Sequence, residues 1–164
     1  MLLGNAFLAR RLVSESPRRK KSAGQPIAKI AANLSFSVAM ILGVGTDLAE
    51  VERIGRSVER FGDRFLVRVF TPRERVYAMA KANWAQRLAA RFAAKEAGMK
   101  AIGTGLSRGV SWQHLEVVNE PSGRPTLHLY AAALERANAL GVKRVSISLT
   151  HTKDVAFAVV ILED

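Results

Sequence analysis

The chain has 164 residues, enough for one domain with an extension, and its 49% apolar content excludes global disorder. The absence of Cys excludes a disulfide framework and a thiolate metal site, and it suits a reducing compartment, so we expect a cytoplasmic protein. No stretch has the roughly 18 consecutive apolar residues of a membrane span. The net charge of +11 favours anionic partners such as phosphates, nucleic acid or an acidic protein.

The charge is concentrated in residues 1–39, which contain seven Lys or Arg and one acidic residue. Because the stretch SESPRRKKSAGQP cannot bury an apolar face, we expect a disordered, basic N-terminal extension. Its composition suits an organelle transit peptide, and also a solvated tail or an upstream start with Met40 opening the folded part. We favour the second interpretation, because composition alone supports targeting, and expect a single domain over residues 40–164.

The first half of that domain is predicted to be a strand followed by helices. ILGVGTD (41–47) is an apolar strand ending at Asp47, and LAEVERIGRSVERF (48–61) has apolar residues at helical spacing. Thr71 to Glu74 matches a capping box with proline at the first helical position, so a helix begins there and runs to about residue 82. A long helix is expected from about residue 85 to 101, ended by the glycines of GTG (103–105).

The second half is richer in strands. WQHLEVV and PTLHL flank a hairpin loop at residues 119–123, and AAALERANALG is a helix closed by Gly141. VSISLT alternates apolar and polar residues, and a turn leads from it into the apolar VAFAVVIL. This order of elements predicts an α+β fold, with helices packed on a mainly antiparallel sheet.

The long helix allows two interpretations. Its alanines share one side, which would let another backbone approach closely, and Lys95 lies between the bulky residues of a second stripe. Glu96 and Lys100 lie at one edge of that stripe and Arg91 at the other. These charges are either solvated i, i+4 pairs or groups held near a packed boundary.

A metal and phosphate site is the functional interpretation of these charges. Asp47 is either a helix cap or a carboxylate that projects into a crevice. Together with Glu96 it would hold Mg²⁺, which typically takes one or two carboxylates, several waters and phosphate oxygens. The remaining groups predicted to contact phosphate are Arg91, Lys95, Lys100 and the backbone N–H groups of Gly103, Thr104 and Gly105.

Two further features have both a structural and a functional interpretation. The arginines of the first helix lie on one face or just beyond it, and form either a solvated surface or a dock for an acidic partner: Arg53, Arg56, Arg60 and Arg64. His151 is either a hydrogen-bonded turn residue or a phosphate contact.

Four motifs together resemble the holo-(acyl-carrier-protein) synthase family, the small bacterial 4′-phosphopantetheinyl transferases: GVGTDLAEVERI (43–54), RFAAKEAGMKAIGTG (91–105), NEPSGRP (119–125) and SLTHT (148–152). The resemblance runs from about residue 41 to 163 and does not account for residues 1–39. It implies the phosphopantetheinyl transferase fold and transfer of the phosphopantetheine arm of coenzyme A to a serine of apo acyl carrier protein. The other product would be 3′,5′-ADP, and the reaction would require Mg²⁺ as cofactor. The resemblance also implies a role in fatty acid biosynthesis.

The resemblance also assigns residues. Asp47 and Glu96 match the metal ligands. From the chemistry we hypothesise that Glu96, directly or through a metal-bound water, helps remove the serine proton and that Lys100 supports the leaving phosphate. Positions around the coenzyme A phosphates are Arg91, Lys95, Lys100 and Gly103–Gly105, and those around the adenosine end are Arg124, Pro125, His151 and Thr152. The first-helix arginines match the surface for the carrier protein. The family is typically a homotrimer with active sites between subunits. Here Asn119-Glu120 stands where Asn-Asp is commoner, and Arg124 where Lys is common.

Two other functions remain open from the sequence. The basic composition also suits an RNA- or ribosome-binding protein, although recognised RNA-binding motifs are missing, so we expect no nucleic-acid partner. A non-enzymatic module that binds the carrier protein or a nucleotide is the second alternative. The intact Asp47, Glu96 and Lys100 argue against it.

Overall fold

The computed structural model describes residues 39–164, so the expectations for the N-terminal extension lie outside it. The elements of the described part are, in order, β1 (Ile41–Glu50), α2 (Val51–Phe61), α3 (Asp63–Val69), α4 (Pro72–Met79), α5 (Trp84–Ala101), the 3₁₀ turn η1 (Trp112–His114), β2 (Leu115–Asn119), β3 (Pro125–Leu129), α6 (Ala131–Ala139), β4 (Arg144–His151) and β5 (Val155–Glu163). No helix within residues 39–164 has both the length and the apolarity needed to cross a membrane.

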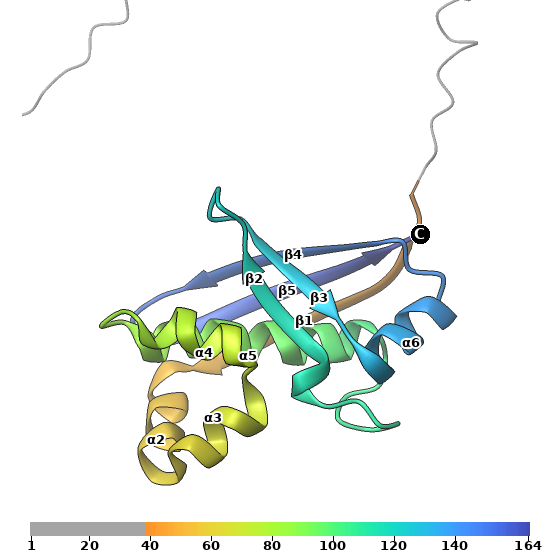
Figure 1. Cartoon of the computed structure of the whole chain (residues 1–164). Helices are drawn as coiled ribbons and strands as arrows, with labels where there is room; N and C mark the ends of the chain where they lie inside the picture. Colours follow the sequence, from red (N-terminus) through yellow and green to blue (C-terminus); the bar gives the residue numbers. More distant parts are fainter. Residues whose placement is uncertain (1–38) are drawn as a thin grey trace, which may run out of the picture. The chain divides into compact units, whose positions relative to one another are not determined.

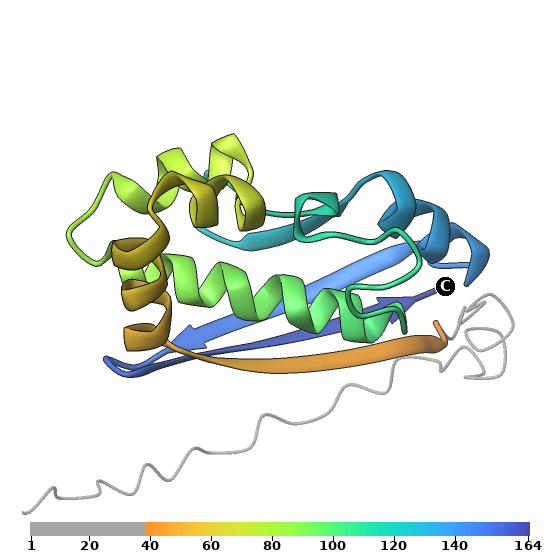
Figure 2. The ribbon, with the colours of Figure 1, turned by 90° about the horizontal axis from the view of Figure 1, so that it is seen from below.

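The strands form two antiparallel sheets, which confirms the predicted α+β class. One sheet has the order β1-β5-β4, and the other is the hairpin β2–β3. Helix α5 lies along one face of the three-stranded sheet, and α4 and the hairpin cover the opposite side of that helix (Figures 1 and 2). Helix α5 is therefore the central element of the domain, and residues on its different sides face different surroundings.

Close packing between α5 and the sheet confirms the expectation from the alanine side of the helix. Ala93 and Ala97 are completely buried. A Cβ added at Gly45 would collide with the backbone of Ala97, and one at Gly43 with that of Ala101. Glycine in β1 and alanine in α5 thus let the two backbones touch, which fixes the position of β1 along the helix.

The capping box at Thr71 and Glu74 is present, and the helix that it starts ends at Met79, earlier than predicted. The first strand differs more. It continues through Asp47, which pairs with Ala158, and ends at Glu50 because β5 pairs with it along that length. The residue before helix α2 is Glu50, so the interpretation of Asp47 as a helix cap is wrong. Helix α3 was not predicted.

Candidate active site

Asp47 and Lys100 meet between β1 and α5. The Nζ of Lys100 lies 2.8 Å from Oδ1 of Asp47 and 2.9 Å from the carbonyl oxygen of Thr46. The Lys100 side chain is 52% exposed and that of Asp47 17% exposed. Since the Lys100 side chain is half exposed, water weakens this ion pair, and Lys100 can exchange its partner for a ligand at small cost.

Glu96 lies one helical turn before Lys100, about 40° around the helix from it, so both face the same side of α5. Successive contacts of Gly43 with Ala101 and of Gly45 with Ala97 show that β1 runs antiparallel to α5. Asp47, two residues further, therefore lies beside the turn of the helix that carries Glu96. Asp47 thus contacts Lys100, which shares a side of α5 with Glu96, and the pairing of Asp47 and Glu96 as metal ligands stays a prediction.

The donor set of this region suits Mg²⁺ better than a transition metal. Residues 39–164 contain no cluster of three or more His, Cys, Asp or Glu side chains. Two carboxylates are sufficient to bind Mg²⁺, because this ion keeps several of its waters and takes phosphate oxygens of a substrate as further ligands. One oxygen of Glu96, Oε1, accepts a hydrogen bond from Nε1 of Trp112 at 2.6 Å. Asp47 and Glu96 thus fit a magnesium site that a phosphate ligand would complete.

The GTG turn does not have the predicted role. The N–H of Gly103 donates to the carbonyl of Lys100, and those of Thr104 and Gly105 donate to Met99. All three N–H groups therefore close the C-terminus of α5, helped by the positive φ of Gly103 (72°) and Gly105 (55°). In this conformation they are not free to contact a phosphate, and the sequence prediction is wrong on this point.

Lys95 also lies elsewhere than expected. Its side chain is completely buried and forms an ion pair with Oε2 of Glu74 at 2.7 Å, where the Glu74 side chain is likewise 0% exposed. Nζ also donates to the carbonyls of Val69 and Trp112. An ammonium group with three partners in the interior does not reach a coenzyme A phosphate, so Lys95 is corrected from a ligand contact to a structural group.

A basic cavity of about 220 Å³ lies on another side of α5. Three of its lining residues were predicted to contact coenzyme A: Arg91, Pro125 and His151. A fourth, Arg87, was missed in the sequence analysis. Arg87 is four residues before Arg91 and therefore lies on the same helix face, and this spacing could have identified it from the sequence. Arg91 is nearly buried, stacks 4.1 Å from the ring centre of Tyr77, and donates to Asn119 at 2.6 Å. Arg87 is the less buried cation.

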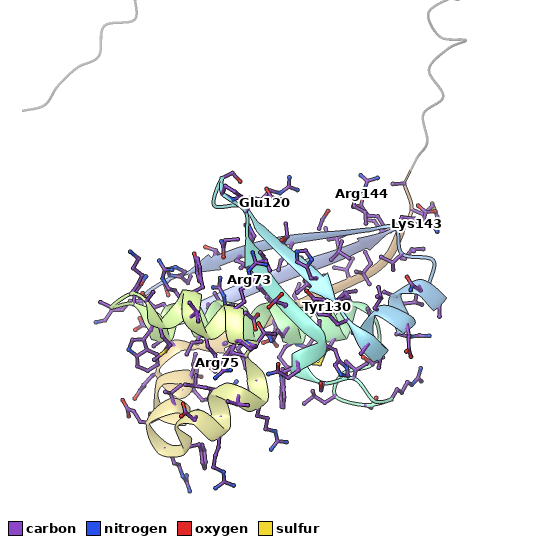
Figure 3. All side chains as sticks on the ribbon, viewed as in Figure 1. Arg73, Arg75, Glu120, Tyr130, Lys143 and Arg144 are labelled. Carbon is purple, nitrogen blue, oxygen red and sulfur yellow. The ribbon has the colours of Figure 1, made fainter. Side chains whose placement is uncertain are left out.

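Arg124 and Thr152 flank this cavity without lining it. Arg124 is exposed in the loop of the β2–β3 hairpin, next to Pro125, and Glu120 marks the tip of that loop in Figure 3. The Oγ1 of Thr152 accepts the N–H groups of Asp154 and Val155 and so closes the turn between β4 and β5. Thr152 therefore holds the turn that places His151.

The two groups of predicted site residues lie on different sides of α5. Glu96 is about 140° around the helix from Arg91 at 100° per residue. The contacts agree: Arg91 reaches β2 through Asn119, whereas Lys100 reaches β1 through Asp47. Within one chain, Glu96 and Lys100 thus face a different surface from Arg87 and Arg91.

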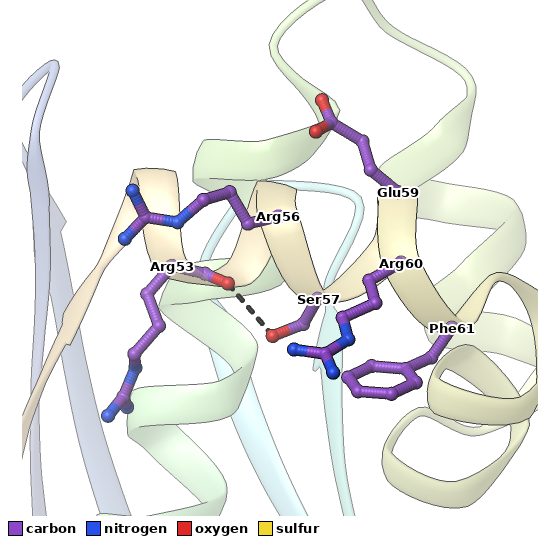
Figure 4. Close-up of a pocket in the computed structure, with 6 residues that line it drawn as sticks. All are labelled: Arg53, Arg56, Ser57, Glu59, Arg60 and Phe61. Atoms are coloured by element: carbon purple, nitrogen blue, oxygen red, sulfur yellow. Dashed lines mark hydrogen bonds between the residues drawn. The ribbon is translucent and has the colours of Figure 1, made fainter.

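The arginines of α2 form a third feature. Arg53, Arg56 and Arg60 line a shallow pocket of about 510 Å³, shown in Figure 4 with Ser57, Glu59 and Phe61. Arg56 pairs with Glu52 at 2.6 Å, and the guanidinium of Arg60 lies 5.1 Å from the ring centre of Phe61. Arg64 borders an adjoining cavity of about 500 Å³ whose other lining residues are Phe61, Phe65, Arg68, Val69, Phe92 and Trp112. Through Trp112, the basic surface extends to the neighbourhood of Glu96.

Known proteins resemble this chain in sequence and in fold. A family model for the 4′-phosphopantetheinyl transferase superfamily matches residues 43–160. Holo-[acyl-carrier-protein] synthases of Solibacter usitatus and Koribacter versatilis are 57% and 55% identical over 125 residues, which is 76% of this chain and all of theirs.

Two solved structures have the same fold. A holo-[acyl-carrier-protein] synthase from Neisseria meningitidis has a TM-score of 0.69 and 36% identity, covering 76% of this chain and all of that one. One from Bacillus anthracis, in complex with CoA (3′,5′-ADP), has a TM-score of 0.63 and 36% identity over 76% of this chain and 98% of that one.

Proposed function

The chain belongs to the 4′-phosphopantetheinyl transferase superfamily, and we propose that it transfers 4′-phosphopantetheine from coenzyme A to a serine of apo acyl carrier protein with the help of Mg²⁺. The products are holo acyl carrier protein and 3′,5′-ADP, and the context is fatty acid biosynthesis in the cytoplasm. The observation that supports the proposal is the contact of Lys100 with Asp47, beside the helix α5 that also carries Glu96 one turn earlier.

The chemistry follows from charge. Attack of the serine hydroxyl on the β-phosphate of coenzyme A develops negative charge on the phosphoryl oxygens and on the departing 3′,5′-ADP. When bound, Mg²⁺ would neutralise charge on those oxygens. Asp47 and Glu96 would hold the ion, and Glu96 would accept the serine proton, directly or through a water. Lys100 leaves Asp47 and contacts the leaving phosphate, which it can do because its side chain is half exposed.

We also propose a homotrimer with active sites between subunits. Asp47 and Glu96 lie on a different side of α5 from Arg87 and Arg91, and we assign the two sets to different halves of an active site between subunits. A second copy would supply the missing half. The outer face of the β1-β5-β4 sheet supports this arrangement, since Val44, Leu48 and Phe157 are 54%, 57% and 38% exposed on it.

For the carrier protein, the proposed dock is the arginine surface of α2. Acyl carrier protein must present its serine close to Glu96, and the cavity from Arg64 to Trp112 connects the two regions. A basic surface would steer an acidic partner toward this site.

Mass spectrometry tests the transfer directly. We expect the protein, incubated with coenzyme A, Mg²⁺ and apo acyl carrier protein, to add a phosphopantetheine group to the carrier protein, and EDTA to abolish the reaction. Near-normal transfer by Glu96→Gln at saturating Mg²⁺ would contradict the metal assignment, whereas no adduct under any condition would contradict the function itself.

A further inference from the structure

The indole of Trp112 makes a hydrogen bond to Glu96 that the catalytic scheme does not yet use. Nε1 of Trp112 donates to Oε1 of Glu96 at 2.6 Å, and it is the single donor to this carboxylate among residues 39–164. A hydrogen bond to an ionised carboxylate is short and strong, and it fixes the rotation of the group. The second oxygen, Oε2, is left for another ligand.

Trp112 is itself held from several directions. Its ring lies 6.3 Å from that of Phe92, centre to centre, and the guanidinium of Arg68 lies 5.8 Å from the ring centre. Its backbone carbonyl accepts a hydrogen bond from the buried Nζ of Lys95 at 2.9 Å. Both the main chain and the side chain of Trp112 are therefore anchored, which makes the indole N–H a fixed donor.

We propose that Trp112 is a positioning residue for the metal site: its N–H fixes the rotation of the Glu96 carboxylate and leaves Oε2 as the oxygen that would hold Mg²⁺. The inference rests on the proposed function, because it assumes that Glu96 is a metal ligand. A phenyl ring would keep part of the aromatic packing without donating a hydrogen bond. Groups that orient metal ligands in this way commonly change metal affinity by 10- to 100-fold when they are removed.

The test compares Trp112→Phe with Trp84→Phe, which removes the other of the two tryptophans in the chain. Mn²⁺ serves as the probe, and free Mn²⁺ is counted by electron paramagnetic resonance in the presence of saturating coenzyme A. We expect Trp112→Phe to weaken Mn²⁺ binding about tenfold and to raise the Mg²⁺ concentration for half-maximal transfer similarly. Trp84→Phe leaves both quantities unchanged.

A second measurement needs no change at Trp112. In the Trp84→Phe protein, Trp112 is the sole tryptophan, and bound Mn²⁺ should quench its fluorescence until excess Mg²⁺ displaces the ion. Absence of this quenching, or equal Mn²⁺ affinity in Trp112→Phe and the unaltered chain, overturns the positioning role while leaving the transferase proposal intact. If the unaltered chain binds no Mn²⁺ and transfers equally well in EDTA, the metal assignment itself fails.

Discussion

Lys95 and Lys100 lie five residues apart on the same helix and have opposite surroundings. Lys95 is completely buried, with Glu74 and two carbonyls as partners, whereas Lys100 is 52% exposed and pairs with Asp47 at the surface. Burial of an unpaired charge is very unfavourable, so the partners of Lys95 are indispensable to it. The partner of Lys100 is replaceable. The comparison indicates that one lysine of the helix is fixed as part of the architecture, whereas the other can change partners and is available for chemistry.

The largest expected effect is on stability. Lys95→Met removes the ammonium group and leaves the Glu74 carboxylate buried without its counter-ion, so we expect the free energy of unfolding to fall by about 3–5 kcal/mol. Urea unfolding followed by circular dichroism measures this. The double variant Lys95→Met/Glu74→Gln should recover part of the loss, because the charge is then absent from both partners, while the amide keeps only one of the two oxygens that accept the N–H groups of Thr71 and Val117. Unchanged stability of the single variant would show that the pair is not important to the fold.

The same pair predicts a pH dependence. Burial lowers the pKa of Lys95 below 10.5, and the charge of Glu74 opposes this shift. Between the lowered pKa and 10.5, the unfolded chain binds a proton that the folded chain does not, so this group makes stability rise with pH. Relative to the double variant, the unaltered chain should therefore gain stability as pH increases through that window. A loss of relative stability there would contradict the lowered pKa.

The next effect is on activity. Lys100→Met keeps the aliphatic part of the side chain but removes the charge that we assign to the leaving phosphate, so kcat for transfer should fall about 10²- to 10³-fold. Thermal unfolding should change little, because the Lys100–Asp47 pair is half exposed. Lys143→Met, at the start of β4 (Figure 3), removes an exposed lysine elsewhere and is the matched control. Equal activity of the two variants would remove Lys100 from the mechanism.

The contrast also shows what the sequence could predict. Helical periodicity placed Lys95 between Leu88, Phe92 and Met99 and so indicated a packed boundary, but it could not supply the partner. Glu74 already had a local explanation as the last residue of a capping box, and its side chain does accept the N–H of Thr71. Its second role, with Lys95, depends on how α4 packs against α5, and no local pattern encodes that packing.

Asp47 and the GTG turn show the same limit at shorter range. Helical spacing explained residues 48–61 well, so a strand that continues to Glu50 was missed; cross-strand pairing with β5 decided the boundary. For residues 103–105, the sequence correctly predicted the end of the helix. The capping hydrogen bonds then used the N–H groups that had also been assigned to phosphate.

The smallest expected effect concerns the arginine surface of α2, which is exposed like Lys100 but lies apart from the reacting atoms. Arg53→Glu with Arg60→Glu should raise KM for acyl carrier protein about tenfold or more and leave KM for coenzyme A nearly unchanged, since reversal of surface charges mainly slows association with an acidic partner. Added salt should reduce the difference from the unaltered chain. The matched control is Lys143→Glu with Arg144→Glu, which alters the net charge equally at the start of β4 (Figure 3). Equal changes of KM for both substrates, or an equal effect of the control pair, would show that α2 is not a specific dock and that net charge alone attracts the carrier protein.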